Sequence, residues 1–378
     1  MINLIIKHYD RKLMMYLSLL AIIGTIMLYS ASWYESFLST NGNSEMLFLK
    51  NHLKRLLIGM VFLVGFLLFD YRALKHIAPY LIIFSIFLLV LTKAVYLING
   101  YSWYKPARWL SIGSLGFQTS DIARFSILIF MAYYVDKQRD KIANFQNGLL
   151  PALVILLLIM SLIIIQPDYS TAIMIGFLGI LILFIGGAKI SQILLTCSTA
   201  LLIGIPVLLS RAYRRERILS FFGIGDNPDV GYQAHQSLIS LGNGGLFGTG
   251  LGNSIEKNHF LPTPHTDFIF AIIGEELGFL IGTVPVLTLF LLIFFQGIKI
   301  AKNCNDPFGI FLSVGIVSNL ILYAFVNAAV VTGLLPVTGL PMPMVSYGGS
   351  GMIINMSLIG ILLNISQAKR AVGDNIWT

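Results

Sequence analysis

The sequence predicts an all-α, polytopic membrane protein with about ten transmembrane helices and a large extracytoplasmic loop between the seventh and eighth. Of its 378 residues, 56% are hydrophobic and only 11% are charged, so most of the chain needs apolar surroundings on every side. Apolar runs reach about 20 residues, the length that crosses a bilayer as a helix. Helices satisfy their own backbone hydrogen bonds in lipid, which favours them over irregular structure.

The apolar runs predict ten spans in order along the chain. They cover residues 13–32, 53–69, 79–97, 121–135, 148–166, 170–187, 190–210, 268–295, 309–331 and 351–368. The first run follows basic residues, is long, and lacks a small-residue cleavage site, which indicates a retained span. We expect one integral membrane domain over residues 1–378. No internal repeat or low-complexity tract is evident, so an inverted-repeat transporter has no support in the sequence. Cys197 and Cys304 lie far apart and suggest neither a disulfide framework nor a zinc site.

Basic residues predict the orientation of the chain. An even number of spans places both termini on one side, and six basic clusters fall on that side, which the positive-inside rule makes cytoplasmic. These residues are Lys7, Arg11, Lys12, Arg72, Lys75, Lys137, Arg139, Lys141, Lys189, Lys299, Lys302, Lys369 and Arg370. About half of the 25 Lys and Arg residues nevertheless fall on the outer side. A basic outer face suits an anionic headgroup such as a lipid phosphate or pyrophosphate.

One outer loop, at about 211–267, is long enough to indicate a functional segment. It is rich in glycine and begins with RAYRRER, four arginines in seven residues. This run has two interpretations, a solvated charge cluster or a phosphate-binding site, and we favour the second.

Three carboxylates stand in or beside the eighth span, in the stretch HTDFIFAIIGEELGF. With Thr266 as N-cap, Asp267 is either an ordinary acid in a first helical turn or a general base at the rim of a membrane cavity. The helix dipole lowers the pKa of such an acid and apolar burial raises it, so the sequence leaves the balance open. Glu275 and Glu276 lie deeper and must face protein or water. They suit a structural role as well as a functional one.

Other polar groups flank the predicted outer ends of the spans. Asp168 in QPDYSTA suits either a helix N-cap or a cavity wall. Asp121 and Arg124 are spaced i, i+3 on one helix face and suit a local ion pair. Arg108 is followed by Trp109, which suits an interfacial aromatic as well as a site residue. No nucleotide-binding loop, HExxH motif or nucleophile elbow occurs.

Six motifs, in this order and spread over nearly the whole chain, resemble those of the SEDS family of bacterial proteins, which includes FtsW, RodA and SpoVE. They are ARWLSIG, QTSDIAR, QPDYSTA, GYQAHQSLISLGNGGLFGTGLGNS, LPTPHTDFIFAIIGEELG and LLPVTGLPMPMVSYGGSG, with GLGNS and IIGEELG looking more like the FtsW branch than RodA. The chain departs from the family pattern at Thr263, where a Glu is usual, at Asp121, where the acid is longer, and at Gly351, where a Ser is usual.

The resemblance implies a peptidoglycan glycosyltransferase of the bacterial inner membrane that polymerises lipid II on its extracytoplasmic face, in cell division or shape maintenance. It also implies a divalent cation, Mg or Mn. The expected partners are a class B penicillin-binding protein, which is a single-span transpeptidase, and other divisome or elongasome membrane proteins. No nucleic acid is expected.

The resemblance also implies site roles. Asp267 matches the essential acid of the family's HTDF motif, as base or as metal ligand, and Trp109 matches the Trp of its RW motif. The expected substrate-binding residues are Arg108, Trp109, Arg124, Asp168, Arg214, Arg215, Arg217, Lys257, His265 and Ser346. Asp121, Glu275 and Glu276 are expected to support the site from behind.

Two other functions compete with polymerisation. A lipid II flippase needs polar groups deep in several spans, but apart from Glu275 and Glu276 the spans are nearly free of charge. A non-catalytic scaffold for a transpeptidase is compatible with the enzyme and is separated from it by an Asp267→Asn variant that still assembles but does not polymerise.

Overall fold

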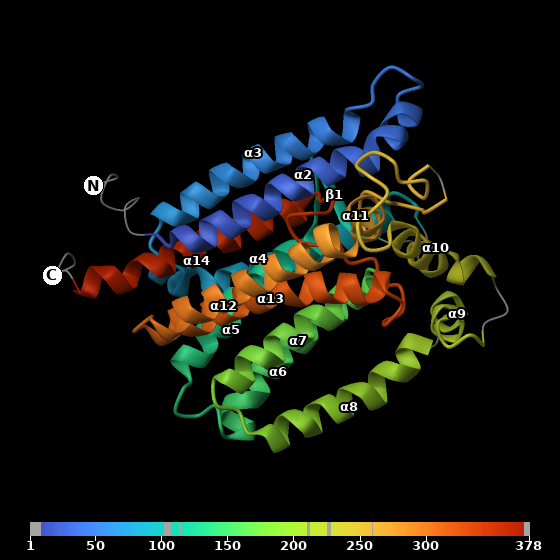
Figure 1. Cartoon of the computed structure of the whole chain (residues 1–378). Helices are drawn as coiled ribbons and strands as arrows, with labels where there is room; N and C mark the ends of the chain where they lie inside the picture. The colour runs from blue at the N-terminus through green and yellow to red at the C-terminus, as the bar shows by residue number, and fades with distance from the viewer. Residues whose placement is uncertain are drawn as a thin grey trace.

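The computed structural model describes residues 9–101, 107–112, 115–209, 212–224, 228–258 and 260–373, and nearly all its regular structure is helical (Figure 1). The long helices are α2 (Arg11–Ser39), α3 (Leu47–Leu68), α4 (Leu74–Ile98), α5 (Thr119–Lys137), α6 (Leu150–Ile165), α7 (Tyr169–Ile185), α8 (Ile190–Leu209), α10 (Pro228–Gly244), α12 (Val284–Lys302), α13 (Pro307–Val331) and α14 (Ser350–Gly373). The shorter elements are η1 (Tyr71–Ala73), β1 (Trp109–Ile112), β2 (Leu115–Gln118), η2 (Phe145–Leu149), α9 (Ala212–Phe221), α11 (Ile269–Gly278) and η3 (Phe279–Thr283).

The predicted helical membrane fold is confirmed. Each predicted span falls on a helical segment, and in the described part of the chain seven segments are long and apolar enough to cross a membrane. Helix α7 and residues 190–206 of α8 are shorter apolar helices. Helix α5 is less apolar because it carries charged residues near both ends. The number of ten spans stays a prediction.

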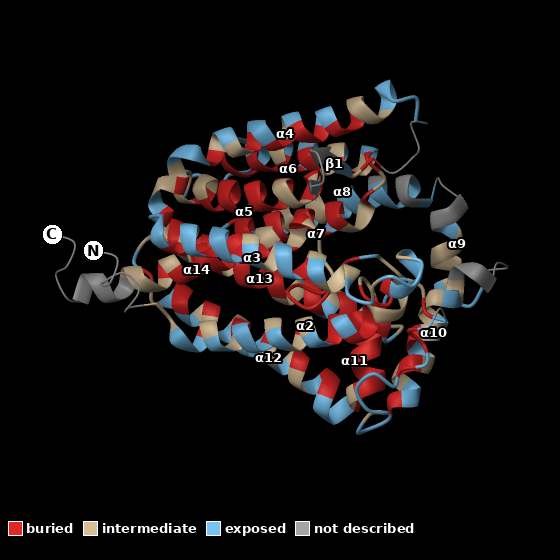
Figure 2. Ribbon diagram, turned by 90° about the horizontal axis from the view of Figure 1, so that it is seen from above, coloured by how far each residue is buried: buried red, intermediate tan, exposed pale blue. Residues whose placement is uncertain are grey.

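Helices α5, α13 and α14 form the interior of the bundle. In α13, 67% of the most apolar window is buried inside the protein, whereas in α3 the share is 22%. Helix α13 packs against α5, α7, α12 and α14, and α14 packs along α3. Figure 2 shows the buried residues concentrated on α5 and α13, with exposed positions on the outward faces of α3, α4 and α12. A helix buried on all sides by other helices can carry polar groups that lipid would exclude.

Different segments of the chain lie at the two ends of the helix bundle. The backbone N–H of Asp10, before α2, donates to Ser366 Oγ of α14 at 3.1 Å, so these two segments share one end. The hairpin of β1 and β2, α9, α10 and α11 gather at the opposite end (Figure 1). In the hairpin the strands are antiparallel and pair Trp109 with Gln118.

The glycine-rich segment between α8 and α12 is more ordered than a loop, since it contains α9 and α10. After α10 the chain packs backbone to backbone on the end of α11. Gly248 has a φ of +83°, and a Cβ there would lie 2.2 Å from the carbonyl oxygen of Glu276. A side chain at Gly248 would therefore push these two segments apart.

The span predicted at 268–295 falls on the single apolar segment Ile269–Lys302, but the helix within that segment is interrupted. Gly278 has a φ of +74° and ends α11, and the π-helical turn η3 then leads into α12. The backbone N–H groups of Phe279 and Leu280 donate to the carbonyls of Gly245 and Leu246 instead of to α11. Only glycine adopts such a φ readily, so Gly278 sets the break.

Candidate active site

A cavity of about 250 Å³ opens at the end of the bundle where the hairpin, α9, α10 and α11 gather. Its walls come from the hairpin, α5, α7, α13, α14 and two connecting segments. The connecting segment at 332–349, between α13 and α14, is called here the α13–α14 linker. Of the residues that the sequence singled out, the cavity is lined by Arg108, Trp109, Asp121, Arg124, Asp168, Asp267 and Ser346. Residues far apart in the sequence thus converge on one polar site.

Asp267 lies at the cavity wall, just before α11. The expectation that it stands in a first helical turn behind a Thr266 cap is wrong, because α11 begins at Ile269 and Thr266 Oγ1 donates to the carbonyl of Thr263. Burial raises the pKa of the Asp267 carboxyl to about 6, although the charges of Arg217 and Arg108 act to lower it. The balance that the sequence left open is therefore decided by desolvation.

Arg108 and Asp168 form a second polar group in the wall. The Arg108 side chain donates to the carbonyl of Pro167, and its Nη1 lies 3.9 Å from Asp168 Oδ1. Asp168 Oδ2 accepts from Gln118 Nε2 at 2.9 Å and from Ser120 Oγ at 3.1 Å. Asp168 directly precedes α7 but makes no capping hydrogen bond, so the cavity-wall alternative holds for it.

The floor of the cavity carries Asp121 and Arg124, one turn apart on α5. Arg124 Nη2 lies 3.1 Å from Asp121 Oδ1, which is the ion pair expected from their spacing. Asp121 Oδ2 also accepts from Ser350 Oγ at 2.7 Å. The Arg124 guanidinium lies 4.6 Å from the centre of the Tyr323 ring and donates to Asn355 Oδ1 at 3.3 Å. The floor is therefore polar, and its one positive charge is balanced by one negative charge.

Trp109 and Ser346 line the cavity in different ways. Trp109 on β1 is 42% exposed and its ring packs close to Gly349, where a Cβ would lie 2.8 Å from the ring. An exposed ring at a cavity suits stacking against an apolar or sugar face. Ser346 is buried, and its hydroxyl accepts a hydrogen bond from the backbone N–H of Met342, so it braces the α13–α14 linker.

The arginines of α9 differ in placement. Arg217 donates from Nη1 to the carbonyl of Val337 at 3.0 Å, and its charge acts on Asp267. Arg215 is exposed and does not line the cavity. The side chain of Arg214 and the whole of Arg211 lie outside the described residues. Of the described α9 arginines, Arg217 is the one brought close to Asp267.

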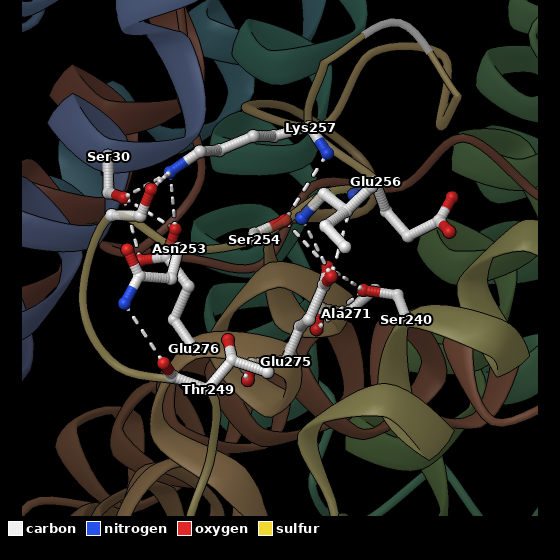
Figure 3. A network of polar contacts seen from close by, with 12 residues as sticks. Ser30, Ser240, Thr249, Asn253, Ser254, Glu256, Lys257, Ala271, Glu275 and Glu276 are labelled. Carbon is white, nitrogen blue, oxygen red and sulfur yellow. Dashed lines mark hydrogen bonds and ion pairs between the residues drawn. The ribbon is translucent and has the colours of Figure 1, made fainter.

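Lys257 is not a cavity residue, which corrects its expected role in binding substrate phosphate. Its ammonium group is buried and lies 2.6 Å from Glu276 Oε1, and Ser30 of α2 donates to the same carboxylate (Figure 3). Glu275 accepts from Ser240 and Ser254 hydroxyls and from the backbone N–H of Ile255. Both glutamates thus tie the segment after α10 to α11 and α2, and their support of the site stays a prediction.

His265 does not line the cavity either. Its ring lies 4.5 Å from that of Phe48 and 5.6 Å from that of Tyr347, measured between centroids. Burial lowers the pKa of His265 to about 4, so the ring is neutral at pH 7. A neutral, packed imidazole does not supply the positive charge that a phosphate needs, and we assign His265 a packing role instead.

Sequence reasoning missed Tyr323, Asn327 and Gly339. Tyr323 lines the cavity, and Asn327 Nδ2 donates to the carbonyl of Asp267 at 2.7 Å. A Cβ on Gly339 would lie 3.4 Å from Asp267 Oδ2. A signal was available for Asn327, since an amide in an apolar span needs a partner. Nothing in the sequence pointed from Gly339 to Asp267.

The fit of a divalent cation can be judged from the carboxylates. Among the described residues no group of three His, Cys, Asp or Glu side chains is placed to hold a metal ion. Asp121 and Asp168 are already paired with arginines, which leaves Asp267 as the carboxylate open to a cation in the described cavity. One carboxylate with substrate phosphate oxygens is a usual arrangement for Mg²⁺. The residues therefore fit a cation held jointly by protein and substrate.

The fold and the site together define a polytopic membrane protein with a polar cavity in which acids and arginines converge, and in which Asp267 is the acid that pairs with no arginine within the described residues. Residues 10–371 match the family model of the FtsW, RodA and SpoVE cell cycle proteins. The probable peptidoglycan glycosyltransferase FtsW of Geobacter sulfurreducens is 36% identical over 363 residues, covering 96% of each chain. Stage V sporulation protein E of Bacillus subtilis is also 36% identical, over 93% of this chain and 95% of its own.

Solved structures agree with this relationship. A chain of a peptidoglycan synthase complex that coordinates polymerization and crosslinking superimposes with a TM-score of 0.75 at 25% identity, covering 96% of this chain and 98% of its own. The rod shape determining protein RodA of Thermus thermophilus superimposes with a TM-score of 0.69 at 25% identity, covering 96% and 97%. This chain belongs to the FtsW/RodA/SpoVE family.

Proposed function

We propose that this protein is a peptidoglycan glycosyltransferase that polymerises lipid II, with Asp267 as the general base. The observation that carries the proposal is the placement of Asp267: a partly buried carboxyl in the wall of a cavity, with its pKa raised to about 6 by desolvation and with the charges of Arg217 and Arg108 acting on it. The activity named for relatives at 35–37% identity over nearly the full chain supports the same reaction.

The reaction needs one base. The 4-hydroxyl of the acceptor sugar attacks the anomeric carbon of the donor, a C–O bond forms, and the bond to the undecaprenyl pyrophosphate breaks. Asp267 accepts the proton of the attacking hydroxyl. Pyrophosphate leaves without needing a proton, so no second carboxyl acid is required. A pKa of about 6 leaves Asp267 mostly ionised at pH 7 while keeping it basic enough to take a proton.

The leaving pyrophosphate needs positive charge where its own charge develops. Arg108 lines the cavity, and Arg217 approaches from α9. We assign both to the pyrophosphate, with Trp109 against a sugar ring and Arg124 at the floor. In its alternative role, as metal ligand instead of base, Asp267 would hold a divalent cation, Mg or Mn, together with the substrate phosphates, and the cation would supply further charge neutralisation there.

The proposed setting is the bacterial inner membrane, with both termini cytoplasmic and the cavity on the extracytoplasmic face, where lipid II is presented. The basic clusters at 7–12, 72–75 and 137–141 support this orientation. The proposed partner is a class B penicillin-binding protein of the divisome or elongasome. Its support is the similarity to a chain of a synthase complex that coordinates polymerization and crosslinking.

Polymerisation of lipid II by purified protein tests the proposal directly. The protein is incubated with lipid II and Mg²⁺ or Mn²⁺, with and without its transpeptidase partner, and compared with Asp267→Ala and Asp267→Asn. We expect long glycan strands from the wild type and none from either folded variant. Polymer from all three would remove Asp267 from the chemistry, and polymer from none with the partner present would favour the flippase or scaffold function.

A further inference from the structure

Within the described part of the chain, Asp267 is held through its main chain. Within the described residues, neither carboxylate oxygen accepts a hydrogen bond from another side chain or from the backbone. Burial raises the pKa of Asp267 and so strengthens it as a base, whereas the charges of Arg217 and Arg108 act to lower that pKa. A free carboxylate is ready to receive the substrate, but its orientation must then be fixed by whatever fixes the backbone around it.

Asn327, near the end of α13, holds that backbone. It is 2% exposed, and its amide Nδ2 donates to the carbonyl of Asp267 at 2.7 Å and to the carbonyl of Leu340 at 2.8 Å. Leu340 belongs to the α13–α14 linker and lines the cavity. One NH₂ group thus joins the segment that carries the base to the opposing cavity wall, using both of its protons.

A second bond supports this junction two residues away. The backbone N–H of Tyr347 donates to the carbonyl of His265 at 2.9 Å. The carbonyl of His265 is therefore bonded directly to the linker, and the carbonyl of Asp267 is joined to the linker through Asn327. Gly339, next to Leu340, lies so close that a Cβ would be 3.4 Å from Asp267 Oδ2.

The linker is itself fixed by donors from three other elements. Each donates to a different linker carbonyl: Arg217 of α9 to Val337 at 3.0 Å, Ser170 of α7 to Thr338 at 2.8 Å, and Arg55 of α3 to Gly348 at 3.3 Å. The linker is thus a frame that several helices hold in place. Asn327 is the residue by which this frame reaches Asp267.

We propose that Asn327 is a positioning residue for the glycosyl transfer reaction, which fixes the Asp267 main chain against Leu340 so that the carboxylate faces the attacking hydroxyl. This inference rests on the proposed function. A base misplaced by about 1 Å costs on the order of 10²-fold in rate, because reacting groups must meet at close range. Substrate binding does not depend on this bond, so the loss should fall on kcat rather than on KM.

The test compares Asn327→Leu with Asn319→Leu in the full-length protein together with its transpeptidase partner. Asn319 lies two turns earlier on α13, is fully buried, and its amide makes no hydrogen bond within the described residues. Both variants make the same chemical change in the same helix, but only one touches Asp267. We expect Asn327→Leu to lower kcat for lipid II polymerisation about 10²-fold, with KM within about twofold of wild type. Asn319→Leu should stay within about twofold in both.

Hydrogen–deuterium exchange supplies a readout that needs no activity. In Asn327→Leu, amides of 263–268 and 340–348, including Tyr347, should exchange at least about tenfold faster than in Asn319→Leu. If Asn327→Leu does not fold, Asn327→Ser, whose hydroxyl carries one proton for the two carbonyls, is measured instead.

Different outcomes would overturn this inference and the proposed function. Unchanged kcat, equal losses in both variants, or unchanged exchange in Asn327→Leu would each overturn the role of Asn327. If wild-type protein makes no polymer, the proposed function fails. The exchange comparison then still decides whether Asn327 fixes the Asp267 segment.

Discussion

At the scale of single residues, the environment of Asp267 predicts the pH dependence of the reaction. The base works only when ionised, and burial raises its pKa to about 6. We therefore expect kcat/KM for lipid II, which reports the substrate-free protein, to be level above pH 7 and to fall about tenfold per pH unit well below pH 6. Rates measured from pH 5 to 8 at constant ionic strength check this. A profile that stays level to pH 5 would contradict Asp267 as base.

The same raised pKa predicts the stability of an Asp267 variant. Because the pKa of the folded protein lies above that of the unfolded chain, the contribution of Asp267 to stability is present at low pH and is lost as pH rises through about 6. At pH 7.5 the buried charge is therefore unfavourable. Asp267→Asn should abolish polymerisation yet unfold at the same or a higher temperature than the wild type, measured by thermal unfolding in detergent at pH 7.5.

Gly339 offers a second prediction at this scale, with a matched control in the same linker. Gly339 and Gly333 have φ values of +70° and +71°, and a Cβ would lie 3.4 Å from the nearest atom at each. That atom is Asp267 Oδ2 for Gly339 and a Leu238 methyl for Gly333. Each alanine variant should lose about 1–2 kcal/mol of stability from backbone strain. Only Gly339→Ala should lower kcat, by about tenfold or more; equal kcat in both variants would show that crowding of Asp267 is harmless.

These residues also mark what sequence alone could predict of the site. Asp267, Arg108, Trp109 and Asp168 are polar or aromatic groups in distinctive motifs, and they do meet at the cavity. Lys257 has equally conspicuous charge, but its partner Glu276 was assigned to packing without a counter-ion. A sequence shows that a residue is charged but not which residues lie beside it in space. A lysine in a buried ion pair therefore cannot be told from one that binds phosphate.

At the scale of elements, hydropathy located the helices but not their interruptions. The apolar run across Gly278 is continuous, and α11 nevertheless ends there because Phe279 and Leu280 bond to the segment after α10. That choice depends on tertiary contacts between glycine backbones, which no periodicity records. The same contacts bring Glu275 and Glu276 to the segment that leads into Asp267 (Figure 3).

The Lys257–Glu276 pair predicts the energetics of that junction. Both side chains are almost completely buried, so removing one partner leaves an uncompensated charge. Lys257→Met should therefore destabilise the protein by about 3–5 kcal/mol. Combining it with Glu276→Gln should recover much of the loss, because no buried charge remains. Thermal unfolding of the wild type, both single variants and the double variant checks this cycle; strictly additive losses would mean that the pair has no coupling.

At the scale of the whole molecule, the two ends of the bundle have different tasks. The end shared by Asp10 and Ser366 is closed by direct contacts between helices, whereas the opposite end holds the cavity. Helix α8 stands at the edge of the bundle, with large apolar side chains such as Leu195 and Leu202 mostly exposed (Figure 1).

The contacts of Lys75 lead to a prediction about the end of the bundle opposite the cavity: a variant there should lower stability without lowering kcat. Its ammonium group lies 2.9 Å from carboxylates of both Asp136 and Asp306, and so joins the start of α4 to the end of α5 and the start of α13. The three side chains are partly exposed, so solvent screens the interaction, and we expect Lys75→Met to lower the free energy of unfolding by about 1–2 kcal/mol.

The control variant is Lys302→Met. Lys302 is exposed at the end of α12 and has no ion pair within the described residues. Both variants remove one positive charge, and the orientation proposed above puts both lysines on the cytoplasmic side. Only Lys75→Met should lower the unfolding temperature, and both should keep wild-type kcat while folded; a fall in kcat for Lys75→Met alone would show that the closed end controls the cavity.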